Sequence, residues 1–135
     1  MFREWFRANV EVPLGSVGIS IELRTVRVDN RINKPGPVFL SMARAAYEMH
    51  ADFMYRVNDD TELLTLWTTP FIYALMQLSP PYGAVGPLSY GTSNRILTHD
   101  FVHRTHMEVF EMNYYPPEFT DWWCDDWISV VCCNM

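Results

Sequence analysis

Between residues 17 and 57, the spacing of apolar side chains changes from a strand period to a helix period and back again. Residues 17–26 place apolar side chains at alternate positions, which is typical of a β-strand with one buried face. A loop of turn-forming residues, 29–37, follows, and Pro37 at its end suits the first position of a helix. A second apolar run, 52–57, then leads into acidic residues. This order predicts a strand–helix–strand unit of a parallel sheet, with the acidic residues at the end of its second strand.

The same patterns predict the other elements. Residues 62–78 are rich in large apolar side chains and are expected to form a largely buried helix, which Pro70 kinks or divides. Thr105 and Glu108 have the spacing of a capping box, so a helix is expected to begin near His106. The remaining expected elements are a helix at 2–9, a short strand around Val85, a strand at 96–102, and a last helix that Thr120 or Asp121 caps and that contains Trp122, Trp123, Asp125, Asp126 and Trp127.

Length and charge limit the classes of protein that this chain can belong to. Its 135 residues fit one domain, residues 1–135. The net charge of −6 without a basic run argues against a nucleic-acid partner. No apolar run reaches the roughly 18 residues of a membrane span, and the first residues carry charges where a signal peptide is apolar. Because Cys124, Cys132 and Cys133 show neither disulfide nor zinc-ligand spacing, we expect a reducing, cytoplasmic location.

The first candidate site is the acidic pair Asp59 and Asp60, which follows Asn58. Two adjacent carboxylates repel each other unless something neutralises them. Oxygen ligands suit Mg²⁺ or Mn²⁺, which bind through one or two carboxylates together with substrate phosphates. The alternative is that Asp59 or Asp60 only caps the next helix.

The second candidate site contains His99, His103 and His106. On one continuous helix, these side chains would share a face and resemble a metal site. The capping box at Thr105 argues against that arrangement, because it places His99 and His103 in a strand and His106 in a helix. In such a strand Asp100 points to the face opposite His99.

The third candidate site is the run WWCDDW, residues 122–127. Carboxylates among tryptophans can have raised pKa values, as a general base near neutral pH requires. The alternative is an amphipathic helix with a solvated acidic face.

Three stretches, taken in order, resemble a family 2-like glycosyltransferase of the GT-A type: KPGPVF with ARAAYE and YRVNDDTEL, then GAVGPLSYGTSNRILTHDFVHRTHMEVF, then WWCDDW. The resemblance implies an α/β fold with a Rossmann-like, mainly parallel sheet flanked by helices. Compared with the family, the chain lacks the usual first strand and is shortened at both ends.

The resemblance also implies site residues. Asp60, at the last position of a DxD-type motif, would bind the metal, Mn²⁺ or Mg²⁺. Asn58, Asp59 and, less directly, Asp29 would lie on the donor side. The WWCDDW run is similar to the xED motif, which makes Asp126 the catalytic base and puts Asp125 at the Glu position. The acceptor-side residues implied are His99, Asp100, Trp122 and Trp123, with Tyr90 as a further stacking candidate.

The expected function is metal-dependent transfer of a sugar from a nucleoside-diphosphate sugar to a hydroxyl-bearing acceptor, with inversion. One alternative is a truncated, non-catalytic domain of the same type that serves as an interaction module. Another is a metal-dependent hydrolase that uses Asp60, which requires His99, His103 and His106 to converge on one point.

Overall fold

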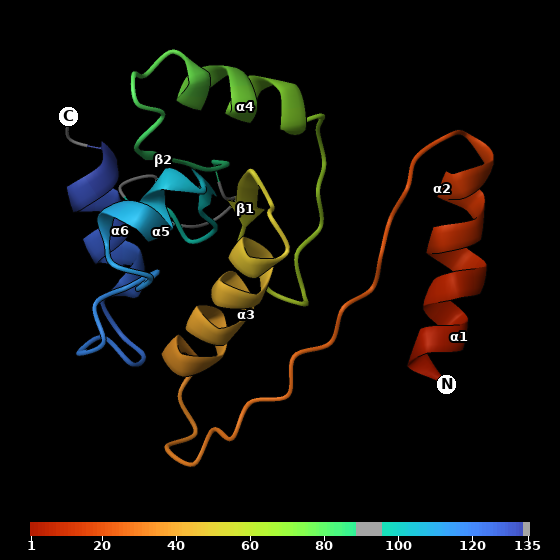
Figure 1. The fold of residues 1–135 in the computed structure, drawn as a ribbon, viewed down its shortest axis with the longest axis horizontal. Coiled ribbons are helices and arrows are strands. Elements are labelled where there is room, and N and C mark those ends of the chain that lie inside the picture. The colour runs from red at the N-terminus through yellow and green to blue at the C-terminus, as the bar shows by residue number, and fades with distance from the viewer. Residues whose placement is uncertain (89–95, 134–135) are drawn as a thin grey trace.

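The computed structural model describes residues 1–88 and 96–133. Figure 1 shows their arrangement. The helical elements are α1 (Phe2–Phe6), the π-helical turn η1 (Arg7–Glu11), α2 (Val12–Ser16), α3 (Gly36–Glu48), α4 (Thr68–Met76), α5 (Thr105–Val109) and α6 (Cys124–Cys133). The strands are β1 (Phe53–Tyr55), β2 (Ala84–Val85) and β3 (Phe101–His103).

The sheet of the described residues is antiparallel, with the strand order β1-β3-β2. Met54 of β1 lies opposite Val102 of β3, and Ala84 of β2 lies opposite the same residue on the other side. The prediction of a Rossmann-like, mainly parallel sheet is therefore wrong. The predicted strand at 17–26 does not form, because residues 19–30 are irregular and pair with no strand in the part of the chain that the structure describes. An alternating pattern shows which side chains share a face, but a strand also needs a neighbour for its backbone groups.

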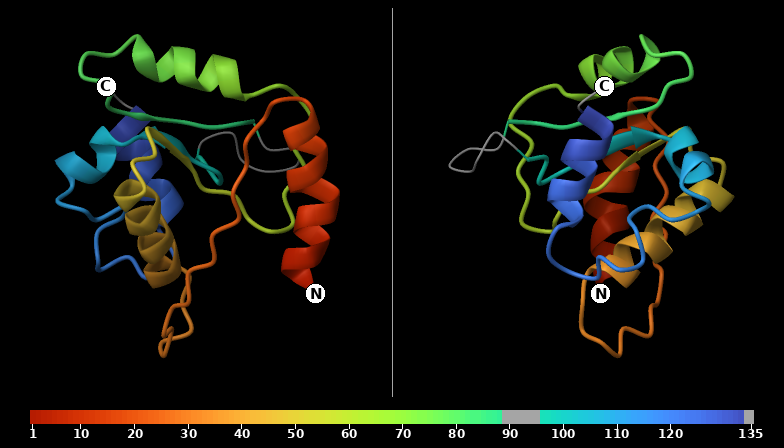
Figure 2. Two further views of the ribbon diagram at one scale, coloured as in Figure 1. Left: turned by 45° about the vertical axis from the view of Figure 1, so that its right-hand side comes forward. Right: turned by 90° about the vertical axis from the view of Figure 1, so that its left-hand side faces the viewer.

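The N-terminal helical segment extends beyond its prediction and lies apart from the rest of the molecule. Residues 2–9 are helical as expected, but α1, η1 and α2 continue the helix to Ser16. None of the residues in these three elements is buried. Figure 1 and the left view of Figure 2 show an extended segment leading from this helix to α3.

Helix α3 confirms the central helix of the predicted unit. Its first residue, Gly36, donates its N–H to the Thr120 carbonyl at 2.8 Å. A Cβ at Gly36 would lie 2.8 Å from the carbonyl oxygens of Phe119 and Thr120, so only glycine allows this approach. Pro37 occupies the first turn, where a missing N–H costs nothing. The helix therefore begins against the chain that leads into α6, and its middle packs into the core through Ala43.

The two faces of the sheet pack against different elements. Met54, Val102 and Ala84 face the main core, which they share with side chains from α3, α5, α6 and the Tyr114–Tyr115 segment. On the other face, the aromatic rings pack against the start of α4. The ring contacts there join Phe53, Tyr55, Trp67, Phe71 and Phe101, with centroid separations of 4.6–5.9 Å.

Helix α4 is shorter and more exposed than the sequence predicts. It covers residues 68–76 of the expected 62–78, and Leu75 is its buried residue. Pro70 lies in the first turn and so marks the beginning of the helix rather than a kink. The composition of this segment indicated burial, but the side chains of Leu63, Leu64 and Leu66 are exposed.

The C-terminal elements form near their predicted places, although the predicted caps do not form. Thr105 Oγ1 donates to the Pro81 carbonyl instead of capping α5, which begins at Thr105 itself. Helix α6 begins at Cys124, and Asp121 pairs with Lys34 at 2.6 Å. Strand β3 takes up only Phe101 and Val102 of the predicted strand and adds His103. No helix among the described residues is long and apolar enough to span a membrane.

Candidate functional site

The acidic pair after β1 lies on an open turn. Asn58, Asp59 and Asp60 are exposed, and the turn is closed by the Thr61 N–H, which donates to the Asn58 carbonyl at 3.3 Å. No ion pair joins Asp59 or Asp60 to a cation among the described residues. Both carboxylates are therefore free to meet a ligand from solvent.

Arg56, two residues before this turn, joins the end of β1 to two carboxylates. Its guanidinium is 2.6 Å from Asp100 Oδ1 and 2.8 Å from Asp125 Oδ1. It also donates to the Thr98 carbonyl at 3.0 Å, and the ring of Phe39 lies 5.0 Å away. Burial alone would lower the pKa of Arg56, but the attraction of Asp100 and the other neighbouring acidic groups raises it, so the guanidinium stays charged.

Asp100 is fully buried and accepts several hydrogen bonds. Besides Arg56, the Tyr114 hydroxyl donates to Oδ2 at 2.6 Å and the Tyr115 hydroxyl donates to Oδ1 at 2.8 Å. Burial raises the pKa values of both tyrosines, and the charge of Asp100 adds to this effect, so both hydroxyls stay protonated as donors. Asp100, expected on the acceptor side, thus lies in the core as the centre of a charged network.

The second acidic cluster begins α6 and divides between two environments. Asp125 is half-buried against Arg56, and its burial raises its pKa while Arg56 opposes the rise. Asp126 lines an apolar groove of about 440 Å³ on the other side of the helix start. The remaining lining residues of this groove are Phe119, Trp123, Trp127, Val130 and Val131. One carboxylate therefore belongs to the charged network, while the next is open to a ligand.

Trp122 and Trp123, directly before α6, are prominently exposed, and Trp123 lines this groove. Their exposed fractions are 79% and 67%, although large aromatic side chains usually lie in the interior. Trp123 has a φ of 77°, a left-handed conformation that bulky residues rarely adopt. Backbone strain of this kind often accompanies binding sites. Of the two indole rings, that of Trp123 lines the groove together with Asp126.

His99 ties the acidic turn to the network. Its Nε2 lies 3.0 Å from Thr61 Oγ1, and the next residue is Asp100. The segment before β3 is also fixed to α6, because the Leu97 N–H donates to Ser129 Oγ at 2.7 Å. The turn after β1, the segment before β3 and the start of α6 thus form one connected region.

The other two histidines contact different partners. His103 Nδ1 lies 3.2 Å from Thr105 Oγ1. His106 is buried, with Nε2 2.8 Å from the Tyr114 carbonyl and Nδ1 4.0 Å from Cys132 Sγ. No group of three His, Cys, Asp or Glu side chains among the described residues could hold a metal ion. The three histidines do not converge, and the hydrolase alternative lacks the arrangement that it requires.

Because His106 is buried, we predict that the free energy of unfolding depends on pH. Burial lowers its pKa below 6.5, although the bond to Tyr114 and the charge of Asp100 oppose this shift. Below pH 6.5 the unfolded chain therefore binds a proton that the folded chain does not, and the free energy of unfolding falls as the pH falls. We expect a slope of up to about 1.4 kcal/mol per pH unit in urea titrations followed by circular dichroism. His106→Gln, which keeps a donor for Tyr114 but does not titrate, should remove this slope; an unchanged slope contradicts the assignment.

The structure places the remaining predicted residues elsewhere. Asp29 is exposed on the N-terminal side of α3, where its carboxylate accepts a hydrogen bond from Arg31 Nε at 2.8 Å. Among the described contacts, none joins Asp29 to the acidic turn or to α6. Tyr90 lies outside the described residues.

Sequence patterns did not single out Arg56, Tyr114 and Tyr115 as site residues. Arg56 is a lone cation at the end of an apolar run, three positions before the first of two acids, which is a weak signal for a buried ion pair. Tyr114 and Tyr115 precede two prolines, and that pattern indicated only a loop. Comparisons with protein families, with curated proteins and with solved structures found no match to this chain.

Proposed function

We propose that this chain is a metal-dependent glycosyltransferase, which moves a sugar from a nucleoside diphosphate to a hydroxyl acceptor with inversion. The observation that carries the proposal is the bond of 2.8 Å between Arg56 and Asp125. It brings the start of α6 to the end of β1, from which the turn with Asp59 and Asp60 continues. The bond between His99 and Thr61 supports the same proximity. Sugar transfer needs acids for the diphosphate and for the acceptor within reach of one sugar, and Asp126 follows Asp125 directly but lies on the neighbouring face of α6.

The donor set of the turn suits Mg²⁺ or Mn²⁺. Asp59 and Asp60 offer carboxylate oxygens on an exposed turn, and Asn58 adds an amide oxygen. These ions commonly bind through one or two carboxylates and complete their shell with water and substrate phosphates. Asp60 would hold the ion, with Asp59 and Asn58 beside it on the donor side. When bound, the ion would neutralise charge that builds on the leaving diphosphate.

The residues at α6 would act on the acceptor. The acceptor ring stacks on Trp122 and Trp123, and its hydroxyl approaches Asp126. Asp126 takes the hydroxyl proton while the oxygen bonds to the anomeric carbon, and the bond from that carbon to the diphosphate breaks with its electron pair. Attack opposite the leaving group gives inversion. Asp125, held by Arg56, fixes the first turn of α6 and so positions Asp126.

The first test is binding of nucleoside diphosphates measured by calorimetry with and without Mn²⁺. We expect at least one member of a panel of uridine, guanosine, adenosine and cytidine diphosphates to bind, and only in the presence of Mn²⁺. Asp60→Asn should weaken this binding at least about tenfold, because the metal loses a charged ligand. The control is Glu48→Gln at the exposed end of α3, which removes the same charge outside the acidic turn. A nucleoside-diphosphate affinity that is the same without Mn²⁺ and the same in Asp60→Asn contradicts the proposal.

A further inference from the structure

Strand β1 forms an edge of the sheet, and its outer backbone groups are free. The Arg56 N–H donates to the Asp100 carbonyl, and the Arg104 N–H donates to the Asp52 carbonyl. In an antiparallel pair, the even-numbered residues of this strand therefore face β3, and Phe53, Tyr55 and Val57 direct their N–H and C=O groups outward. No backbone partner for these three residues occurs among the described residues. Such an edge is a template for another strand.

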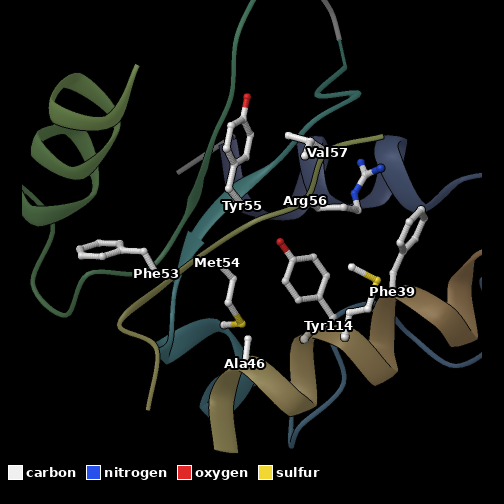
Figure 3. A pocket seen from close by; sticks show the side chains of 10 residues that line it. Phe39, Ala46, Phe53, Met54, Tyr55, Arg56, Val57 and Tyr114 are labelled. Atoms are coloured by element: carbon white, nitrogen blue, oxygen red, sulfur yellow. The ribbon is translucent and has the colours of Figure 1, made fainter. Parts of the chain in front are cut away.

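An apolar groove runs beside this edge. It has a volume of about 330 Å³ and lies between β1 and α3, as Figure 3 shows. Met42, Ala43 and Ala46 line it from the helix, and Met54 and Tyr114 lie on the side of the sheet. A free strand edge next to a groove between strand and helix is the arrangement in which extended peptides add to a sheet, with alternate side chains in the groove.

The chain also contains a segment with the complementary pattern. Val17, Ile19, Ile21 and Leu23 alternate with Gly, Ser and Glu, which is the pattern of a strand with one apolar face. Ile19 is nevertheless exposed, Ile21 and Leu23 are partly exposed, and residues 19–23 belong to no strand in the described structure. Residues 17–26 also contribute none of the side chains that line the groove. The edge of β1 thus has no strand beside it, and residues 19–23 have the pattern of a strand but no sheet to join.

We propose that two copies of this chain form a dimer in which residues 19–23 of each copy add to the edge of β1 in the other. A second copy is favoured because residues 19–23, which follow the turn that ends α2, are already extended at the periphery of the molecule (Figure 1), where the Arg3 guanidinium donates to Thr25 at 2.8 Å. It can therefore pair with a neighbour without leaving its own chain's N-terminal helix. The same contact forms twice by two-fold symmetry, as in most homodimers.

The test is the mass of the protein in solution, measured by light scattering during gel filtration at rising concentration. We expect the wild-type chain to convert to a dimer. Met42→Lys places a charge in the groove and should abolish the dimer. Met49→Lys makes the same substitution just after α3, outside the groove, and should leave the dimer intact. The two methionines are 53% and 50% exposed, so neither change disturbs the core. Ile21→Lys should also abolish the dimer, and Ser20→Lys, on the opposite face of the segment, should retain it.

Mixing the two defective variants identifies the occupant. Met42→Lys keeps an intact segment, and Ile21→Lys keeps an intact groove, so an equimolar mixture should recover a heterodimer with one of the two junctions. A wild-type chain that stays monomeric at every concentration would overturn the proposal, and so would a dimer that both substitutions leave intact. Slow amide exchange at Tyr55 and Val57 in a monomer would also overturn it, because the chain's own segment would then cover the edge.

Discussion

Replacing Arg56 by methionine is expected to lower the free energy of unfolding by about 3–5 kcal/mol. The change keeps much of the side-chain volume but leaves Asp100 buried without its cation. Tyr114 and Tyr115 still donate to this carboxylate, but two neutral hydroxyls do not offset a buried charge. Because domains of this size are stable by only about 5–15 kcal/mol, the loss should be plain in urea titrations followed by circular dichroism.

Two further variants separate the buried network from a general effect of losing an arginine. Arg24→Met removes an exposed arginine that pairs with Glu22 at 2.6 Å, and it should cost less than about 1 kcal/mol. Adding Asp100→Asn to Arg56→Met removes the orphaned charge, so the double variant should lose less than the sum of the two single losses. A cost for Arg56→Met as small as that for Arg24→Met would show that the network does not stabilise the fold.

Local patterns in the sequence were sufficient for the elements whose shape depends on neighbouring residues. Helix α3 was predictable because Pro37 and the helical spacing of apolar residues act within one segment. The predicted run 52–57 contains β1, and the predicted strand around Val85 is β2. These elements need only a local backbone preference and one apolar face.

The sheet was not predictable from such patterns, because pairing joins distant parts of the chain. Residues 17–26 and the run around β1 were read as neighbours since a helix separates them, but β1 pairs with β3, whose paired residues lie 46 to 50 positions further along the chain. For residues 62–78, the composition indicated burial, yet only part of the segment is helical and most of its apolar side chains face solvent. The number of apolar residues in a segment does not show whether another element is present for them to pack against.

The candidate site was predictable to the extent that acidic pairs are recognisable by type. Asp59 and Asp60 could be chosen because adjacent carboxylates are unfavourable without a partner. Asp125 and Asp126 could be chosen because they lie among three tryptophans, and the resemblance to the xED motif singled out Asp126 as the base. The connection between the two clusters could not be read, since it depends on Arg56 reaching Asp125 and on Asp100 being buried under Tyr114 and Tyr115. Each of these contacts joins residues that are far apart in the sequence.

The neighbouring acids of α6 give the sharpest test of the proposed chemistry. Asp126→Asn removes the base and should lower the rate of sugar transfer about 10²–10⁴-fold. Its affinity for the nucleoside diphosphate should stay at the wild-type value, because Asp126 lines the groove with Trp123 and does not belong to the acidic turn. The measurement combines calorimetry of the donor with mass spectrometry of the product formed from a panel of glycoside acceptors.

Asp125→Asn is the matched comparison, because it makes the same chemical change one residue away. Asp125 bonds to Arg56, so its loss should lower the stability of the fold and reduce transfer less than Asp126→Asn does. Arg56 keeps Asp100 as a partner in this variant, and the middle of α6 is still tied to the segment before β3 through Ser129. A base is needed at the acceptor hydroxyl, whereas a positioning residue acts only through the geometry that it maintains. If Asp126→Asn transfers sugar at the wild-type rate while Asp125→Asn does not, the assignment of these two roles is reversed.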